Sequence, residues 1–96
     1  MTSKQRQFLR GLAHPLEPVV RIGRGGVTDA VVEETRKSLV AHELIKVRIG
    51  TDDSSARKTL AARLAEATSS EIAGVVGKIA ILYRARDEKP AIKLPK

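Results

Sequence analysis

Apolar residues recur along the chain with two different spacings, and these spacings predict three helices and four strands. The clearest strand is Leu44–Ile49, in which isoleucine and valine alternate with Lys46 and Arg48. This alternation predicts that one face of the sheet is buried at this strand and that the opposite face meets water. Helical spacing predicts helices over 3–12, 29–42 and 54–68, and β-branched runs predict further strands over 19–22, 71–76 and 79–84.

The order of these elements, α-β-α-β-α-β-β, predicts an α/β fold (α+β, two layers) with a four-stranded mixed sheet. Helices separate the first three strands, so right-handed crossovers should place these strands parallel to one another. Gly77–Lys78 has the glycine that a two-residue hairpin requires, which makes the last strand antiparallel to its neighbour. We expect a single domain over 1–96, with a charged tail over 87–96 that is ordered only in part.

The stretch Gly23–Thr28 joins the first strand to the second helix and carries three glycines and Arg24. Glycine allows the backbone of another molecule to come close. A helix that begins directly after such a turn, here with Thr28 as its N-cap, directs unpaired N–H groups toward an anion. The loop is therefore a candidate phosphate-binding turn, and a plain tight turn between strand and helix is the alternative.

Two nucleotide-binding motifs fit this loop poorly. A P-loop requires G-x-x-x-x-G-K-[ST], and the loop lacks both the lysine and the spacing. A dinucleotide-binding fingerprint requires G-x-G-x-x-G, and Thr28 stands where the third glycine belongs. The shorter pattern G-x-x-G, Gly23 to Gly26, is the one with which KH modules clamp a nucleic-acid backbone.

Composition narrows the range of ligands. The net charge is +7 and the isoelectric point is near 10.3, which is typical of domains that bind nucleic acid and less often of domains that bind anionic membranes. The chain has no cysteine, and His14 and His42 lack neighbouring metal ligands. We expect a protein that is not an enzyme and has no cofactor, metal or small-molecule substrate. The chain shows no signal segment or membrane span, so a cytoplasmic location is expected.

The candidate phosphate-binding residues are the loop and the basic side chains expected near it. Arg84 and Arg86, after the last strand, extend the basic set. The candidates are Gly23, Arg24, Gly25, Gly26, Thr28, Arg21, Lys4, Arg6, Arg10, Lys46 and Arg48.

Several motifs together resemble the CRM domain (chloroplast RNA splicing and ribosome maturation), and most of all the stand-alone bacterial YhbY-like proteins. The resemblance covers essentially the whole chain, and the long first motif is the most specific. The motifs are Lys4–Gln5, Leu9–Leu16, Pro18–Val20, Ile22–Gly23 with Gly26, Leu39 with His42–Val47, Gly77–Lys78, Leu82–Arg84 and Ile92–Pro95.

This resemblance implies a fold similar to the C-terminal domain of translation initiation factor 3 and RNA binding with the G-x-x-G loop as a main contact. Bacterial single-domain members are associated with precursors of the large ribosomal subunit and act in its assembly, whereas related plant domains serve group II intron splicing. We therefore expect a monomeric protein that binds large-subunit ribosomal RNA precursors. The alternatives are a module that docks on a ribosomal or splicing protein through Lys46, Arg48 and the first helix, and binding of duplex DNA.

Overall fold

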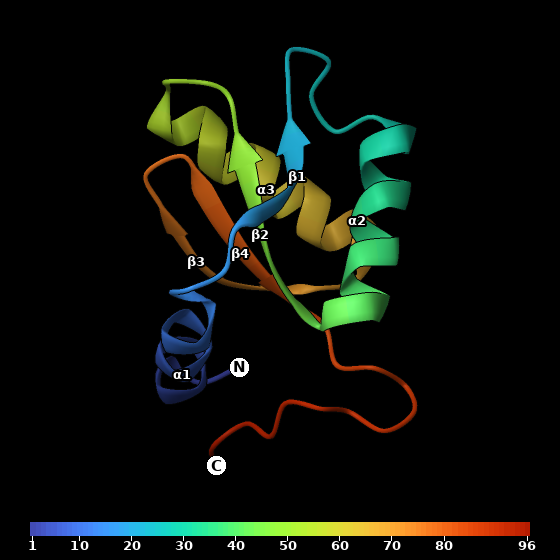
Figure 1. The fold of residues 1–96 in the computed structure, drawn as a ribbon. Helices are drawn as coiled ribbons and strands as arrows, with labels where there is room; N and C mark the ends of the chain where they lie inside the picture. The colour runs from blue at the N-terminus through green and yellow to red at the C-terminus, as the bar shows by residue number, and fades with distance from the viewer.

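The computed structural model describes all residues, 1–96, as three helices and a four-stranded sheet (Figure 1). The predicted elements are all present, with ends that differ from the prediction by one residue at most. The helices are α1 (Ser3–Ala13), α2 (Asp29–His42) and α3 (Ser54–Thr68), and the strands are β1 (Pro18–Ile22), β2 (Leu44–Ile49), β3 (Glu71–Val76) and β4 (Ile79–Tyr83).

The strands lie in the order β1-β2-β4-β3. β1 is parallel to β2, and β4 is antiparallel to both β2 and β3. It follows that β1, β2 and β3 run in the same direction, so the predicted mixed sheet is confirmed. The hairpin Gly77–Lys78 inserts β4 between β2 and β3, and Gly77 has the positive φ of 58° that favours glycine in such a turn.

α2 and α3 cover one face of the sheet, and the main core lies between them and the strands. Alternate residues of β2 point into this core, which also contains Leu39 of α2 and Leu64 of α3. α1 packs on the opposite face, where Leu9 and Ala13 meet Ile81 and Tyr83. The sequence predicted two layers, and α1 adds a partial third layer because β4 also carries apolar residues on this second face. Beyond α1, the second face of β2 is open, as its alternation predicted.

Each helix begins at a side-chain cap, and the cap of α2 is Thr28, as the sequence predicted. Thr2 forms a capping box with Gln5 at the start of α1. The Thr28 hydroxyl accepts the Val31 N–H at 3.2 Å at the start of α2, and Asp53 caps α3. These caps fix where the connecting loops end, including the glycine loop before α2.

Glu43 lies between α2 and β2 and joins the tail to the rest of the fold. Its backbone has a φ of 62° and its side chain is buried. The carboxylate accepts backbone N–H groups of Arg86 at 2.9 Å, Ala91 at 2.6 Å and Ile92 at 3.1 Å. Burial opposes ionisation, but these hydrogen bonds and the charge of Arg86 outweigh it, so the pKa of the carboxyl lies below its ordinary value of 4.5.

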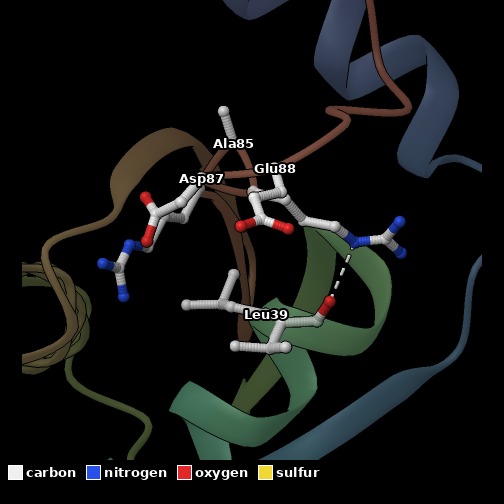
Figure 2. Close-up of a pocket in the computed structure, with 7 residues that line it drawn as sticks. Leu39, Ala85, Asp87 and Glu88 are labelled. Atoms are coloured by element: carbon white, nitrogen blue, oxygen red, sulfur yellow. Dashed lines mark hydrogen bonds between the residues drawn. The ribbon is translucent and has the colours of Figure 1, made fainter.

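The side chain of Arg86 also stabilises the fold, because it binds the C-terminal end of α2. Its guanidinium donates to the carbonyls of Val40 at 2.9 Å and Ala41 at 2.7 Å, which are among the unpaired carbonyls of the last turn of α2. Figure 2 shows the hollow that this turn forms with residues 84–88, and its dashed line is the Val40 bond. Of the two basic residues that follow β4, Arg86 therefore caps a helix.

The tail over 87–96, which was expected to be ordered only in part, contacts the rest of the fold through Ala91, Ile92, Leu94 and Pro95. Besides the bonds to Glu43, the Pro95 carbonyl accepts from the side-chain amide of Gln5 at 3.0 Å. Ile92 and Leu94 pack against the core under α1. The tail thus crosses the end of the molecule that is opposite the glycine loop (Figure 1).

Candidate nucleic-acid interface

Three connecting segments meet at one edge of the sheet because β1, β2 and β3 end there. They are the glycine loop after β1, the turn after β2 and the hairpin after β3. Backbone hydrogen bonds join them: the Gly50 N–H donates to the Ile22 carbonyl at 3.0 Å, and the Ile49 N–H donates to the Lys78 carbonyl at 2.7 Å. These bonds hold the glycine loop beside the turn after β2 and the hairpin, which follow it by more than 20 positions in the chain.

The glycine loop is a tight turn whose glycines have different functions. Gly26 has a φ of 72°, and its N–H donates to the Gly23 carbonyl at 3.1 Å. A Cβ on Gly25 would lie 3.3 Å from the methyl group of Thr28, whereas a Cβ on Gly23 would meet nothing within 4 Å. The backbone conformation favours glycine at 26, a Cβ at 25 would be in tight contact with Thr28, and Gly23 leaves open room for a ligand.

A groove of about 650 Å³ runs beside this loop. Four basic residues line it, and they come from four separate segments of the chain. They are Arg21 of β1, Arg24 of the loop, Arg48 of β2 and Lys78 of the hairpin. The rest of the wall consists of Ile22, Gly23, Gly26, Gly50, Thr51, Ala56 and Leu60.

Arg21 and Arg48 are register partners on neighbouring parallel strands, so their side chains project side by side from the open face of the sheet. Both are exposed, as is Arg24. The ion pairs of the structure join Arg36 to Glu33 and Lys78 to Asp52, so none of these three arginines has a carboxylate partner. Neighbouring unpaired guanidinium groups repel each other and favour a bound anion between them.

Lys78 is the one groove cation that has a partner. Its ammonium lies 2.6 Å from a carboxylate oxygen of Asp52 in the turn after β2. The hydrogen bond and the charge of Lys78 lower the pKa of the Asp52 carboxyl below its ordinary value of 3.8. Asp52 is exposed, so this pair is weak and a phosphate can compete for the ammonium.

The start of α2 is less available to an anion than the sequence suggested. Thr28 uses its hydroxyl to cap the Val31 N–H, and Asp29 adds a negative charge in the first turn. The groove is bordered by α3, through Ala56 and Leu60, and by no residue of α2. Thr28 therefore serves to fix the loop, and the cationic side chains carry the positive potential of the site.

The three basic residues of α1 lie in different surroundings, and only Arg10 lies beside a basic residue of the sheet, Lys46. The Arg10 guanidinium donates to the Ala73 carbonyl at 2.9 Å, and Lys46 of β2 donates to the His14 carbonyl at 3.2 Å, so both lie where α1 meets the open sheet face. Lys4 lines a shallow hollow between α1 and Pro95 of the tail. α1 and the tail lie at the opposite end of the molecule from the glycine loop (Figure 1). Arg6 is half-buried on the same helix and borders neither the groove nor the hollow beside Arg10 and Lys46.

Sequence reasoning missed Lys78 as a candidate. It stands in a hairpin far along the chain from the glycine loop, and its neighbours in the sequence carry no binding motif. The signal that could have found it is topological, because the turn between β3 and β4 must lie at the edge where β1 and β2 also end. A basic residue in that turn is brought beside the loop by the sheet alone.

No helix of the structure has the length and apolar character that spanning a membrane requires. No group of three or more histidine and acidic side chains is placed to hold a metal ion.

The fold and the basic edge define a small α/β protein that presents a glycine loop beside unpaired arginines. Residues 1–84 match the family model for the CRS1 / YhbY (CRM) domain. The chain belongs to this family, as its motifs predicted.

Relatives support this assignment over the full length. An RNA-binding protein of Haemophilus influenzae is 38% identical over 96 residues, which cover 100% of this chain and 96% of the relative. The "Probable RNA-binding protein YqeI" of Bacillus subtilis is 34% identical, with 99% of each chain covered. The solution structure of the hypothetical protein SAV1595 from Staphylococcus aureus superposes with a TM-score of 0.88 at 38% identity, again with 99% coverage of both chains. These relatives are named for RNA binding rather than for catalysis, in agreement with the prediction that this chain is not an enzyme.

Proposed function

We propose that this protein is a non-catalytic RNA-binding factor that binds precursors of large-subunit ribosomal RNA in the cytoplasm and assists assembly of that subunit. The observation that carries RNA binding is the cluster of Arg21, Arg24 and Arg48, exposed and without acidic partners, beside a glycine loop. Relatives named as RNA-binding proteins support the class of ligand. The ribosomal target rests on the resemblance to bacterial single-domain members of the family.

In this proposal, a phosphate of the RNA backbone lies in the groove. The Arg24 guanidinium contacts it from the loop, and Arg21 and Arg48 contact it from the sheet. Gly23 and Gly25 have no side chain to hold the RNA backbone away. Since contacts to phosphate carry little sequence information, specificity has to come from the shape of the RNA or of the particle that contains it.

The loop is tested by Arg24→Glu, with Lys37→Glu on the exposed outer side of α2 as a control of equal charge change. A substitution at Gly25 is less informative because its Cβ would press on Thr28. We expect Arg24→Glu to weaken binding of a large-subunit RNA fragment by at least tenfold, and Lys37→Glu to have a much smaller effect. Equal losses in the two variants, with both folded, would mean that the loop has no specific role.

The ribosomal target is tested by cross-linking in cells followed by sequencing of the bound RNA. We expect enrichment of large-subunit precursor sequences, and loss of that enrichment in Arg24→Glu. Recovery of mostly messenger RNA would contradict the ribosomal assignment. Salt-insensitive capture of a protein partner without RNA would favour the alternative of a protein-docking module, because phosphate contacts weaken steeply with salt.

A further inference from the structure

A second hollow, of about 290 Å³, lies on the open face of the sheet where α1 meets it. Its walls are Arg10 and His14 on the α1 side and Lys46 on the β2 side. Its floor is aliphatic and is formed by Val76, Ile79 and Ile81.

The floor is unusual because apolar side chains are exposed within a strongly basic face. Val76 is 62% exposed, although it lies on a strand next to the core. Ile79 is half-buried and Ile81 is buried, so the aliphatic floor extends from the exposed Val76 toward the core. α1 covers only part of this face, and nothing else in the chain covers Val76.

The cations at the rim are held in place by the fold. Arg10 donates to the Ala73 carbonyl, and its aliphatic stem lies over Gly74, where a Cβ would come within 2.8 Å of the arginine Cδ. Lys46 donates to the His14 carbonyl at the end of α1. These contacts use one donor of each side chain and leave the remaining N–H groups available at the rim.

The hollow and the phosphate groove are neighbours on one surface. Lys46 and Arg48 are two residues apart on β2 and project from the same face, about 7 Å apart along the strand. Arg48 is also the register partner of Ile79, which forms part of the hollow's floor. A chain that binds at Arg48 therefore reaches the hollow within one or two nucleotides.

We infer that the hollow receives an unpaired base, and that the RNA recognised by this protein is single-stranded where it crosses the sheet. This inference rests on the proposed binding of the RNA backbone in the groove. In an A-form duplex the bases are stacked inside, and the accessible minor groove presents hydroxyl groups rather than a protruding base, so a recessed apolar floor has nothing to contact. A single strand can turn one base into the hollow while its phosphates follow the line from Arg24 to Lys46.

The chain offers an aliphatic surface for this base instead of an aromatic one. Its aromatic residues are Phe8, on the solvent side of α1, and Tyr83, which is buried. Burying a base on valine and isoleucine gains less than stacking it on an aromatic ring. The contribution of the base should therefore be modest in comparison with that of the phosphates, and it should be nearly independent of salt.

The test compares three probes of about ten nucleotides, a length within the usual range of single-strand binding sites. They are oligouridylate, the same ribose-phosphate chain without bases, and an oligoadenylate–oligouridylate duplex. Fluorescence anisotropy at fixed ionic strength gives each affinity for the wild-type protein, for Val76→Ser, and for the matched control Val40→Ser on α2, which is 66% exposed and distant from this face.

We expect oligouridylate to bind roughly three- to tenfold more tightly than the chain without bases, and more tightly than the duplex. Val76→Ser should reduce the difference between the first two probes, whereas Val40→Ser should leave it unchanged. Equal binding of the chains with and without bases, or tighter binding of the duplex, would overturn the inference while leaving backbone binding intact. No salt-dependent binding to any probe would overturn the proposed function itself.

Discussion

At the carboxyl ends of β1 and β2, Arg21, Arg24 and Arg48 are exposed and have no acidic partner in the chain. At the amino end of β2, Glu43 is buried and its carboxylate accepts three backbone N–H groups. Both regions contain charged groups. The Glu43 carboxylate has partners within the fold, whereas the three arginines at the opposite end of the strands have no acidic partner. Charge alone therefore does not mark a binding surface, and the absence of an internal partner marks it better.

The same distinction separates arginines that look alike in the sequence. Arg86 has its guanidinium committed to two carbonyls of α2, and Arg36 donates to the Ala67 carbonyl of α3. Arg21 and Arg48 make no such contact. Substitution of Glu43 should therefore lower the free energy of unfolding with little effect on RNA affinity. Substitutions in the groove should lower RNA affinity with little effect on the free energy of unfolding.

The largest effect is expected from Arg21→Gln combined with Arg48→Gln. Loss of two charge-assisted contacts should weaken RNA binding on the order of 100-fold, and it should reduce the slope of log affinity against log salt by roughly 1.4. The free energy of unfolding should change by less than about 0.5 kcal/mol. Titrations at several salt concentrations and urea denaturation measure the two quantities. The control is Lys37→Gln combined with Lys58→Gln, which removes the same number of charges elsewhere on the surface. An equal change of slope in the control would mean that Arg21 and Arg48 bind RNA no better than other surface charges.

The next largest effect is expected from Glu43→Gln, which replaces one carboxylate oxygen by an amide group that cannot accept an N–H. We expect a loss of about 2 kcal/mol in the free energy of unfolding, measured by urea denaturation. RNA affinity should stay within about twofold under conditions where the variant is folded. Glu34→Gln, on the exposed side of α2, should be neutral. An unchanged stability in Glu43→Gln would mean that the hydrogen bonds of the Glu43 carboxylate contribute nothing to the fold.

The pH dependence of stability provides a smaller test. Because the pKa of Glu43 is lowered on folding, its contribution is fully present above the ordinary value of 4.5 and is lost as the pH falls through the folded value. The stability difference between the wild type and Glu43→Gln should therefore be constant from pH 7 down to about 5 and should shrink at lower pH. A difference that grows on acidification would contradict the sign of this shift.

The smallest effect is expected from Asp52→Asn. Removing the carboxylate frees the ammonium of Lys78 and makes the groove more positive, so RNA should bind about two- to threefold more tightly. Asp87→Asn changes the net charge equally at a site distant from the groove, and it should have less effect. A weaker affinity in Asp52→Asn would mean that the ion pair positions Lys78 for RNA instead of competing with it.

Most of the fold could be predicted from the sequence because local signals agree with the packing. The alternation in Leu44–Ile49 predicted the buried and the open face of β2, and Thr28 caps the helix that it was expected to cap. Gly77 indicated the hairpin. The placement of α1 on the second face was not anticipated, because it depends on the outward-facing residues of β4.

The candidate site was less predictable, since it is assembled from segments that are distant in the sequence. The loop and the pair Arg21 and Arg48 were identified, but Lys78 was not, because its place beside the loop follows from strand order. The tail's attachment to Glu43 was also missed. That contact pairs a carboxylate with backbone N–H groups, which have no signature in the residue types.

The bonds to Glu43 also have a consequence for how the protein opens locally. The amides of Arg86, Ala91 and Ile92 share one acceptor group, and Glu43 itself has a positive φ that costs roughly 1–3 kcal/mol unless the surroundings enforce it. Release of the tail would remove this enforcement. The three amides should therefore exchange with solvent deuterium as one cooperative unit together with the amide of Glu43, which closes the last turn of α2.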